Sequence, residues 1–387
     1  MSGTTAPTHD QIIEALRPVQ DPELRRSIVE LGMVRDVTVG DDGMIGVQIA
    51  LTVAGCPLRN EIQSRVGDAV TQLAGVTGFA LDFTVMTDQE REALRDKLHG
   101  HSHSPQSGGQ QQGHGHAEGK PVPFNQPGNK TRPLLIASGK GGVGKSSVTV
   151  NLAVALAGQG YSVGVVDADI YGYSVPRMLG TERDPVVIDD MLLPPEAHGV
   201  RCISIGYFVP AGQAVIWRGP MLHKALEQFL ADVFWDNPDF LLIDMPPGTG
   251  DIALSLSQYL PRAEVYVVTT PQPAAQKVAA LAAAMAAKVN MTVKGVIENM
   301  SWFVGDDGKR YEIFGRGGGQ ELADSLGVPL LGQLPLLPEL RAGGDNGNPI
   351  TVSHPESEAA KAFQQIASRI ATELKSKKIF NAALKVN

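Results

Sequence analysis

The sequence is poor in cysteine and has no excess of positive charge. Only Cys56 and Cys202 occur in 387 residues, too few for a secreted disulfide scaffold and typical of a reducing compartment. The 33 basic residues are outnumbered by 41 acidic ones, and the net charge is -8. This balance argues against general electrostatic binding to nucleic acid or to an anionic membrane.

The sequence also lacks a recognisable targeting or membrane-spanning segment. Met1–Asp10 contains neither a basic cluster nor an apolar run, so no secretory signal is expected. The most apolar helix-like stretch, Ala274–Val289, carries Lys277 and Lys288 and is too short to span a bilayer. We therefore expect a soluble cytoplasmic protein that neither inserts stably in a membrane nor binds nucleic acid.

The composition changes sharply between residues 99 and 132. There, Gly, Gln, Ser, His and Pro replace every periodic apolar pattern, which predicts a flexible linker. The predicted organisation is a small domain at 1–98, the linker at 99–132, a large domain at 133–376 and a tail at 377–387.

Before the linker, the spacing of hydrophobic residues changes between that of a helix and that of a strand. Short helices are expected at Gln11–Leu16 and Glu23–Leu31, the second begun by Asp21 and Pro22. The segments that follow alternate as two strands, a helix and a third strand: Val34–Val39, Ile45–Val53, Pro57–Leu73 and Leu81–Val85. This pattern predicts a small α+β domain.

After the linker, short apolar runs alternate with helical patterns. The runs are Leu134–Ala137, Val163–Val166, Phe240–Ile243, Val265–Val268, Val293–Ile297 and Leu330–Leu334. Continuous apolar strands are buried on both faces, and helices between them imply right-handed crossovers. The prediction is an α/β domain built on a doubly wound, mostly parallel sheet.

A glycine-rich loop follows the first of these strands and precedes the helical pattern Ser147–Ala157. Its pattern is that of a phosphate-binding loop, in which backbone N–H groups and a helix N-terminus hold the phosphates. Lys145 would reach the outer phosphates, and the Ser146 hydroxyl would bind magnesium. The residues expected to contact ATP here are Gly139, Lys140, Gly141, Gly142, Val143, Gly144, Lys145, Ser146 and Ser147.

Carboxylates and an amide end three further strands. Asp244 ends an apolar strand, in the position that holds magnesium beside a phosphate-binding loop, and Met245–Asp251 after it can act as a switch segment. Asp167 and Asp169 end another strand, where one of the pair could instead cap a helix. Asn299 follows a third strand and could read an adenine edge or form a turn.

Lys140 at the second position of the loop resembles the deviant loop of the family that contains MinD, ParA and nitrogenase iron protein. In that family this lysine crosses a homodimer interface to the partner's nucleotide. The resemblance therefore implies an ATP-dependent homodimer with Lys140, Lys145 and Asp169 as catalytic residues. It also implies that Asp169 positions the attacking water, that Asp167 supports magnesium and that Asn299 reads the base.

Four segments make the resemblance narrower: Asp169–Gly172, Trp217–Met221, Met245–Asp251 and Glu298–Ser301. Together they resemble the Mrp (ApbC) family of iron–sulfur cluster carrier ATPases. Asp21–Leu24 and Thr52–Pro57 resemble the signatures of the iron–sulfur assembly domain fused to bacterial members. The implied function is to carry clusters to apo iron–sulfur proteins, with cluster assembly proteins as further partners.

One departure affects the cluster ligands. The family usually has Cys-x-x-Cys shortly after the Glu298–Ser301 segment, but this chain has Gly305–Gly308 there. Cys202 lies in an apolar strand pattern and is expected to be packed in the core. Cys56 lies in a Gly-Cys-Pro loop before a helix, where thiolate is favoured, so it is either an iron–sulfur ligand or a packed, capping thiol.

The remaining features leave other functions open. The linker histidines could bind metal or could simply be tolerated in a polar linker; they are His99, His101, His103, His114 and His116. A positioning ATPase like MinD or ParA, without iron–sulfur chemistry, is the alternative function. A third hypothesis makes the N-terminal domain an adaptor that recruits assembly partners.

Overall fold

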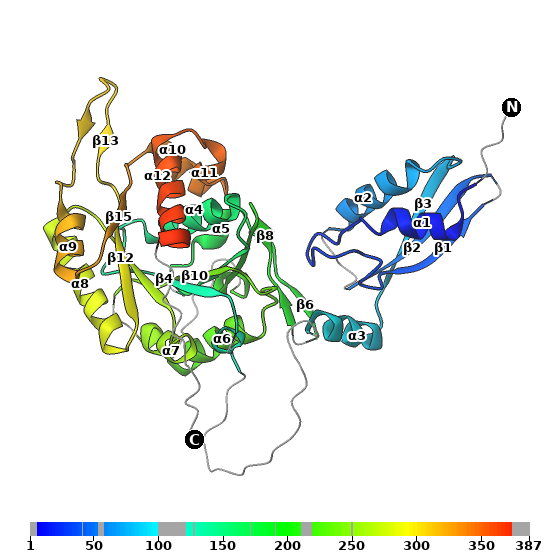
Figure 1. The fold of residues 1–387 in the computed structure, drawn as a ribbon, viewed down its shortest axis with the longest axis horizontal. Coiled ribbons are helices and arrows are strands. Elements are labelled where there is room, and N and C mark those ends of the chain that lie inside the picture. Colours follow the sequence, from blue (N-terminus) through cyan, green and yellow to red (C-terminus); the bar gives the residue numbers. More distant parts are fainter. Residues whose placement is uncertain are drawn as a thin grey trace, which may run out of the picture. The chain divides into compact units, whose positions relative to one another are not determined.

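The structure, a computed structural model, describes residues 6–40, 42–52, 58–99, 121–126, 128–170, 172–189, 191–209, 219–248 and 251–373. The chain forms two compact units (Figure 1). The N-terminal unit lies within Met1–Ala117 and includes the hairpin segment Val186–Leu193, and the C-terminal unit comprises the rest. The predicted limits of the linker and tail stay predictions, because residues 100–120 and 374–387 lie outside the described part.

The N-terminal unit is the predicted small α+β fold. Its strands are β1 (Val34–Val39), β2 (Met44–Leu51) and β3 (Gly78–Val85), in the order β1-β2-β3. β1 runs antiparallel to β2, and β3 runs parallel to β2. The helices are α1 (His9–Leu16), α2 (Arg59–Thr71) and α3 (Asp88–His99), of which the last was not predicted.

The predicted helix at Glu23–Leu31 is wrong, because this segment is a series of turns. Asp21 does cap its start, since Oδ1 accepts hydrogen bonds from the backbone N–H groups of Glu23 and Leu24. Arg25 then adopts a left-handed φ of 52°, which ends any helix and turns the chain back. Leu24 and Ile28 are fully buried, so their helix-like spacing reflects packing in the core.

The C-terminal unit is built on an eight-stranded sheet in the order β15-β12-β11-β4-β10-β5-β9-β8. All adjacent pairs are parallel except β8 with β9. The strands are β4 (Arg132–Ser138), β5 (Val163–Asp167), β8 (Glu196–Ala197), β9 (Val200–Ser204), β10 (Phe240–Asp244), β11 (Glu264–Thr269), β12 (Thr292–Glu298) and β15 (Leu330–Gln333). The six predicted apolar strands are thereby confirmed as a doubly wound, mostly parallel sheet.

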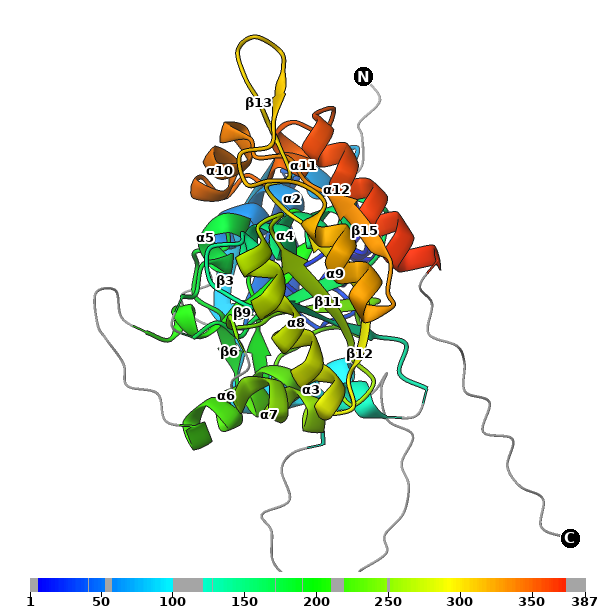
Figure 2. The ribbon, with the colours of Figure 1, turned by 90° about the vertical axis from the view of Figure 1, so that its left-hand side faces the viewer.

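Helices cover this sheet in two layers (Figures 1 and 2). α4 packs against α5, α11 and α12 on one face, while α8 and α9 pack against β11 and β12 on the other. Because both faces are covered, every residue of β5, β9, β10 and β11 is buried. The helices are α4 (Lys145–Gly158), α5 (Val175–Leu179), α6 (Gly219–Ala231), α7 (Asp251–Tyr259), α8 (Pro273–Lys288), α9 (Gly318–Leu326), α10 (Pro338–Asp345), α11 (Ile350–Ser353) and α12 (Glu358–Ser368).

Short elements complete the two units. Two small hairpins, β6 (Val186–Ile188) with β7 (Met191–Leu193) and β13 (Phe303–Val304) with β14 (Arg310–Tyr311), lie outside the large sheet. Three short helical turns occur at η1 (Pro123–Asn125), η2 (Ile205–Tyr207) and η3 (Arg369–Glu373). Among the described helices, none combines the length and apolarity that a membrane crossing needs.

The end of the predicted linker packs on the C-terminal unit. Phe124 in η1 is buried, and its backbone carbonyl accepts a hydrogen bond from Arg262 at 2.8 Å. His99, the first residue of the predicted linker, instead ends α3. Flexibility stays a prediction for the part of the linker that follows, where His101, His103, His114 and His116 lie outside the described residues.

Candidate nucleotide-binding site

The glycine-rich loop lies between β4 and α4, as predicted for a phosphate-binding loop. Gly144 is the N-cap of α4 and has a φ of 78°, a conformation that few other residues adopt. A Cβ atom at Gly144 would lie 2.3 Å from Asn299 Nδ2. The loop therefore needs glycine here both for its backbone conformation and for the approach of Asn299.

Gly139 at the start of the loop is needed for a different reason. A Cβ atom there would lie 2.3 Å from the carbonyl carbon of Val278 in α8. The loop and the first turns of α8 thus pack backbone to backbone. This contact fixes where the side chain of the next residue, Lys140, begins.

Lys145 and Asp244 form the buried centre of the site. Lys145 Nζ donates to Asp244 Oδ2 at 2.7 Å, and the Ser146 hydroxyl donates to the same oxygen at 2.6 Å. The Lys145 and Asp244 side chains are 6% and 0% exposed. The parallel register of β10 with β4 brings Asp244 beside the loop, so the structure assembles these three predicted residues.

Thr149 is a member of this cluster that the sequence analysis missed. Its hydroxyl donates to Asp244 Oδ1 at 2.6 Å, so both carboxylate oxygens have partners. Thr149 lies four residues after Lys145 and three after Ser146 on α4, which places all three on one face of the helix. That spacing, together with the strand-ending Asp244, is the signal that could have revealed it.

Asp167 and Asp169 lie on the other side of Asp244. Asp167 pairs in register with Asp244 across β5 and β10, and it accepts hydrogen bonds from Ser204 Oγ and from the backbone N–H of Val175. Burial, followed by the charge of Asp244, raises the pKa of Asp167 to about 7. Asp169 Oδ2 lies 4.0 Å from Lys145 Nζ, so both predicted carboxylates lie at the phosphate end of the sheet.

The raised pKa of Asp167 predicts a pH-dependent stability of the nucleotide-free protein. An acid whose pKa is higher in the folded than in the unfolded state stabilises the fold while protonated, and this contribution is lost as the pH rises from about 4 to 7. Asparagine does not ionise, so the stability of the Asp167→Asn variant does not fall through this group as the pH rises. We expect the variant to exceed the wild type by about 2 kcal/mol in unfolding free energy at pH 8, and to be less stable or equal at pH 5.

This prediction is checked by urea unfolding without nucleotide or magnesium, followed by tryptophan fluorescence. All three tryptophans (Trp217, Trp235 and Trp302) belong to the C-terminal part of the chain. Parallel pH dependences for wild type and Asp167→Asn would contradict the prediction.

Asn299 lies against the glycine-rich loop. Its side-chain Nδ2 donates to the Val143 carbonyl at 2.9 Å, while its backbone N–H donates to the Thr269 carbonyl. Asn299 is 3% exposed, and within the described residues its Oδ1 has no hydrogen-bond partner. An unpartnered buried acceptor is the group that an adenine amino group would satisfy.

Lys140 has a hydrogen-bond partner within its own chain. Its Nζ donates to Gln272 Oε1 at 3.2 Å, and both side chains are half-buried. Gln272 immediately precedes α8 and was not singled out from the sequence.

The oxygen atoms of the site fit a magnesium ion of the kind that binds with a nucleotide. Ser146 Oγ and Asp244 Oδ2 are hard donors only 2.6 Å apart. Within the described residues, no group of three or more His, Cys, Asp or Glu side chains could hold a metal by itself. A nucleotide-bound magnesium ion does not need such a group, since phosphate oxygens and water complete its coordination.

The predicted iron–sulfur ligand Cys56 lies outside the described residues, as do Tyr171, Trp217, Arg218, Thr249 and Gly250 from the motif segments. Cys202 is fully buried in β9, and burial raises the pKa of its thiol to about 12. A neutral, enclosed thiol is a core side chain and not a ligand. Gly305–Gly308 forms the turn between β13 and β14 and presents no thiol.

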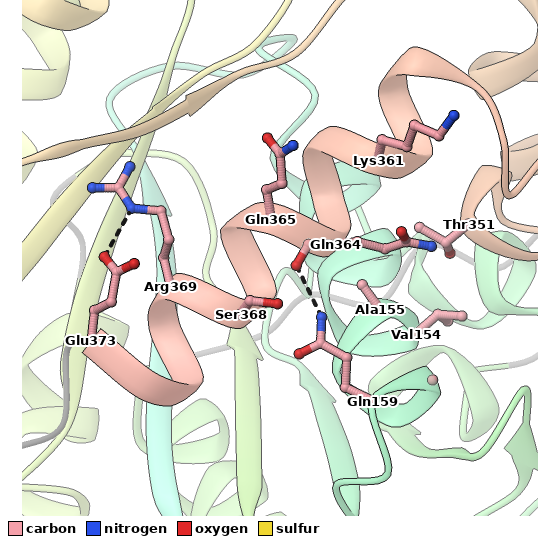
Figure 3. Close-up of a pocket in the computed structure, with 11 residues that line it drawn as sticks. Val154, Ala155, Gln159, Thr351, Lys361, Gln364, Gln365, Ser368, Arg369 and Glu373 are labelled. Atoms are coloured by element: carbon pink, nitrogen blue, oxygen red, sulfur yellow. Dashed lines mark hydrogen bonds and ion pairs between the residues drawn. The ribbon is translucent and has the colours of Figure 1, made fainter.

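A groove of about 730 Å³ lies between α4 and α12, away from the glycine-rich loop (Figure 3). It is lined by the C-terminal half of α4, including Ala155, and by the C-cap residue Gln159, whereas Lys145 begins the helix. Gln159 Nε2 donates to the Gln364 carbonyl across it at 2.9 Å. This groove is therefore not part of the nucleotide site.

Comparisons with known proteins agree with this geometry. Residues 9–79 match the iron–sulfur cluster assembly protein family. An iron–sulfur cluster carrier protein of Mycobacterium tuberculosis is 48% identical over 379 residues, with 96% of each chain covered. One of Deinococcus radiodurans is 42% identical over 369 residues, with 95% of each chain covered.

A solved structure shows the same fold in the C-terminal unit. The nucleotide-binding protein of Archaeoglobus fulgidus, in complex with ADP, is 33% identical, with a TM-score of 0.52. The match covers 60% of this chain and 93% of that one. Residues 129–371 match the family model of the NUBPL iron-transfer P-loop NTPases, and the chain therefore belongs to this family.

Proposed function

We propose that the chain is a magnesium-dependent ATPase that works as a homodimer in the cytoplasm and carries iron–sulfur clusters to apoproteins. The observation that carries the ATPase half is the buried cluster of Lys145, Ser146 and Asp244 at the end of a glycine-rich loop. The carrier half is supported by relatives that match nearly the whole chain and are named iron–sulfur cluster carrier proteins.

Each residue has a distinct part in ATP hydrolysis. The backbone N–H groups of Gly141–Ser147 and the N-terminus of α4 hold the phosphates, while Lys145 moves from Asp244 to the outer phosphate oxygens. Ser146, Asp244 and Asp167 would hold magnesium, which would supply positive charge against the charge that develops on the phosphates. Asn299 Oδ1 accepts a hydrogen bond from the adenine amino group.

Asp169 and Lys140 complete the proposed reaction. Asp169 orients a water molecule whose oxygen bonds to the γ-phosphorus as the bond to the β–γ bridging oxygen breaks, giving ADP and phosphate. Lys140 reaches across the homodimer to the partner's nucleotide and stabilises the charge on the leaving phosphates. ATP hydrolysis and dimer contacts are thereby coupled.

The proposed cargo site depends on Cys56. Cys202 is enclosed in the core, and the β13–β14 turn contains no thiol. Two Cys56 side chains in a homodimer would leave a four-iron cluster short of thiolates. We therefore propose a two-iron or labile cluster, completed by histidine, carboxylate or an external thiol.

We predict that Cys56→Ala loses most of the iron and sulfide bound after anaerobic reconstitution, while Cys202→Ala keeps them. The reason is that only Cys56 can present a thiolate to the cluster. Iron and sulfide content, absorption spectra and transfer to an apo-ferredoxin measure the result. The Cys202→Ala variant is the matched control, because it removes the same group from the core.

Retention of wild-type iron, sulfide and transfer by both variants would contradict the cysteine-based carrier mechanism. A wild-type protein that binds no iron or sulfide after reconstitution but still turns over ATP would instead favour the positioning ATPase. Capture of assembly proteins by the full chain separates cluster binding from an adaptor role. Capture that is lost when Cys56 alone is changed depends on the cluster ligand, whereas capture that survives the change favours the adaptor role.

A further inference from the structure

Glu298 is a buried acid that the proposed reaction does not use. It ends β12, directly before Asn299, and its side chain is fully buried. Burying a carboxylate is costly unless its oxygen atoms accept hydrogen bonds. The partners of Glu298 therefore show what this residue does in the fold.

The carboxylate of Glu298 joins three segments of the chain. Oε1 accepts hydrogen bonds from Ser301 Oγ at 2.8 Å and from Gln333 Nε2 at 2.6 Å, and Oε2 accepts one from the backbone N–H of Gly319. Ser301 belongs to the turn after β12, Gln333 ends β15, and Gly319 lies in the first turn of α9. The carboxylate thus ties the turn after β12 to two elements that pack beside this strand (Figure 2).

The first turn of α9 approaches this carboxylate closely. A Cβ atom at Gly319 would lie 2.7 Å from Glu298 Cβ, and one at Gly318 would lie 2.3 Å from the Pro271 carbonyl oxygen. Two consecutive glycines therefore let the start of the helix pack against β12 and against the loop before α8. The helix N-terminus also favours the negative charge of the carboxylate, so α9 is a fixed anchor for it.

The turn that Glu298 ties down has an unfavourable backbone conformation. Met300 has a left-handed φ of 57°, which a residue other than glycine keeps only where its surroundings hold it there. Two bonds of Ser301 close the turn: its hydroxyl donates to Glu298, and its backbone N–H donates to the Leu334 carbonyl at 2.9 Å. Loss of the carboxylate removes the side-chain bond that spans the turn.

This turn decides which end of the Asn299 amide faces the base. Nδ2 donates to the Val143 carbonyl, and the buried Oδ1 has no partner among the described residues. An amide accepts hydrogen bonds at one end and donates them at the other, so an asparagine that can rotate suits either kind of base. With Nδ2 bound to the glycine-rich loop, only an acceptor remains, which suits the 6-amino group of adenine and opposes the 6-oxo group of hypoxanthine.

We propose that Glu298 is a positioning residue for base selection: its carboxylate holds the turn at 298–301 so that Asn299 presents only an acceptor to the base. The site then selects 6-amino purines over 6-oxo purines. This inference rests on the proposed function, in which Asn299 reads adenine, and adds the residue that makes the reading selective. Without Glu298 the turn relaxes and the Asn299 amide rotates, while the contacts to the phosphates remain.

Two substitutions at Glu298 separate its hydrogen bonds from its charge. Glu298→Met keeps a long, unbranched side chain but removes both acceptors. Glu298→Gln removes the charge but keeps the bonds. Its Oε1 accepts from the Gly319 N–H, and its Nε2 donates to the Ser301 hydroxyl and to the side chain of Gln333 once that amide has turned over.

Two further variants make the comparison safe against damage to the fold. Ser301→Ala removes only the bond that spans the turn and leaves the other two partners of the carboxylate in place. Val296→Ala is the matched control for loss of stability, because Val296 is fully buried two residues earlier on the same strand and does not touch the turn. Thermal unfolding of each protein reports its stability separately.

The measurement is the ratio of the dissociation constants for inosine diphosphate and ADP, obtained by isothermal titration calorimetry on the full chain with magnesium. These nucleotides share ribose and phosphates, and neither has a γ-phosphate, so base selection is measured without hydrolysis. We expect the wild type to favour ADP about 30-fold, the effect of one buried acceptor that faces another. The ratio should fall to about threefold in Glu298→Met and about tenfold in Ser301→Ala, and stay within about twofold of wild type in Glu298→Gln and Val296→Ala.

An unchanged ratio in Glu298→Met, or in Ser301→Ala if Glu298→Met does not fold, would overturn the positioning role. A ratio that falls as far in Glu298→Gln or Val296→Ala would also overturn it, because the effect would then follow charge or stability. A wild type that binds both nucleotides equally would overturn base reading by Asn299, which belongs to the proposed function. Absence of phosphate release from ATP by the wild type would contradict the proposed ATPase and leave the ratio of the two diphosphates as it is.

Discussion

Lys145→Ala is expected to lower the turnover number for ATP at least about 100-fold, the scale seen when one charge-stabilising group is removed from an active site. Lys145 begins α4 within the glycine-rich loop and is 6% exposed, so water cannot replace its charge efficiently. Its Nζ lies 2.7 Å from Asp244 and 4.0 Å from Asp169. The lost charge is therefore the one that we place at the outer phosphates. Release of inorganic phosphate at saturating ATP measures the effect.

The structure requires a control for this substitution. Asp244 is fully buried, and Lys145→Ala leaves its carboxylate without the positive charge beside it. Breaking a buried ion pair on one side costs about 3–5 kcal/mol, so the single variant loses stability as well as turnover. Lys145→Ala combined with Asp244→Asn removes both charges and restores much of that stability.

Thermal unfolding separates the two effects. We expect the paired variant to unfold closer to wild type than Lys145→Ala does, while both lack turnover. Wild-type phosphate release by either variant would overturn the assignment of the glycine-rich loop as the ATPase site.

The fold of the C-terminal unit could be predicted because each buried parallel strand is a continuous apolar run. Phe240–Ile243 is such a run, and the residue that follows it, Asp244, lies at the carboxyl end of the sheet. Asp167 ends β5 in register with Asp244, so one rule about strand ends located both carboxylates. The glycine-rich loop could be predicted from the spacing of its own residues alone.

The contacts that depend on distant segments could not be predicted in this way. Gln272 meets Lys140 across 132 residues of sequence, and Thr149 reaches Asp244 across 95. At Glu23–Leu31, the apolar spacing suits a helix, but a left-handed Arg25 and the bridge between Gln20 and Ser27 fold the segment into turns. The conformation and contacts of such segments depend on tertiary packing, which the local pattern of a single sequence does not specify.

Asp169→Asn is expected to keep ATP binding within about twofold of wild type while lowering turnover roughly 100- to 1,000-fold. The two variants at Lys145 and Asp169 should therefore fail in different ways. Asp169 lies at the edge of the site, with its side chain 14% exposed, and it is 4.0 Å from Lys145. Its replacement does not leave a buried charge without its closest partner, so the fold is expected to survive.

The local geometry around Asp169 also supports an intact variant. Asp169 Oδ1 accepts a hydrogen bond from the backbone N–H of Gly172 at 3.2 Å, and an asparagine Oδ1 can accept the same bond. The loop after β5 therefore keeps its shape, and the phosphates still meet Lys145 and the N-terminus of α4. What asparagine loses is the negative charge that would orient the attacking water and stabilise its developing positive charge.

Two measurements on the same protein test this expectation. Equilibrium binding of a fluorescent ATP analogue gives the affinity, and phosphate release at saturating ATP gives the turnover number. Asp169→Glu serves as a second variant, because it restores the charge at a shifted position and should recover part of the turnover. Asp169→Asn that binds ATP weakly but turns over normally at saturation would make Asp169 a binding or structural residue, and the water-positioning role would then belong to another group.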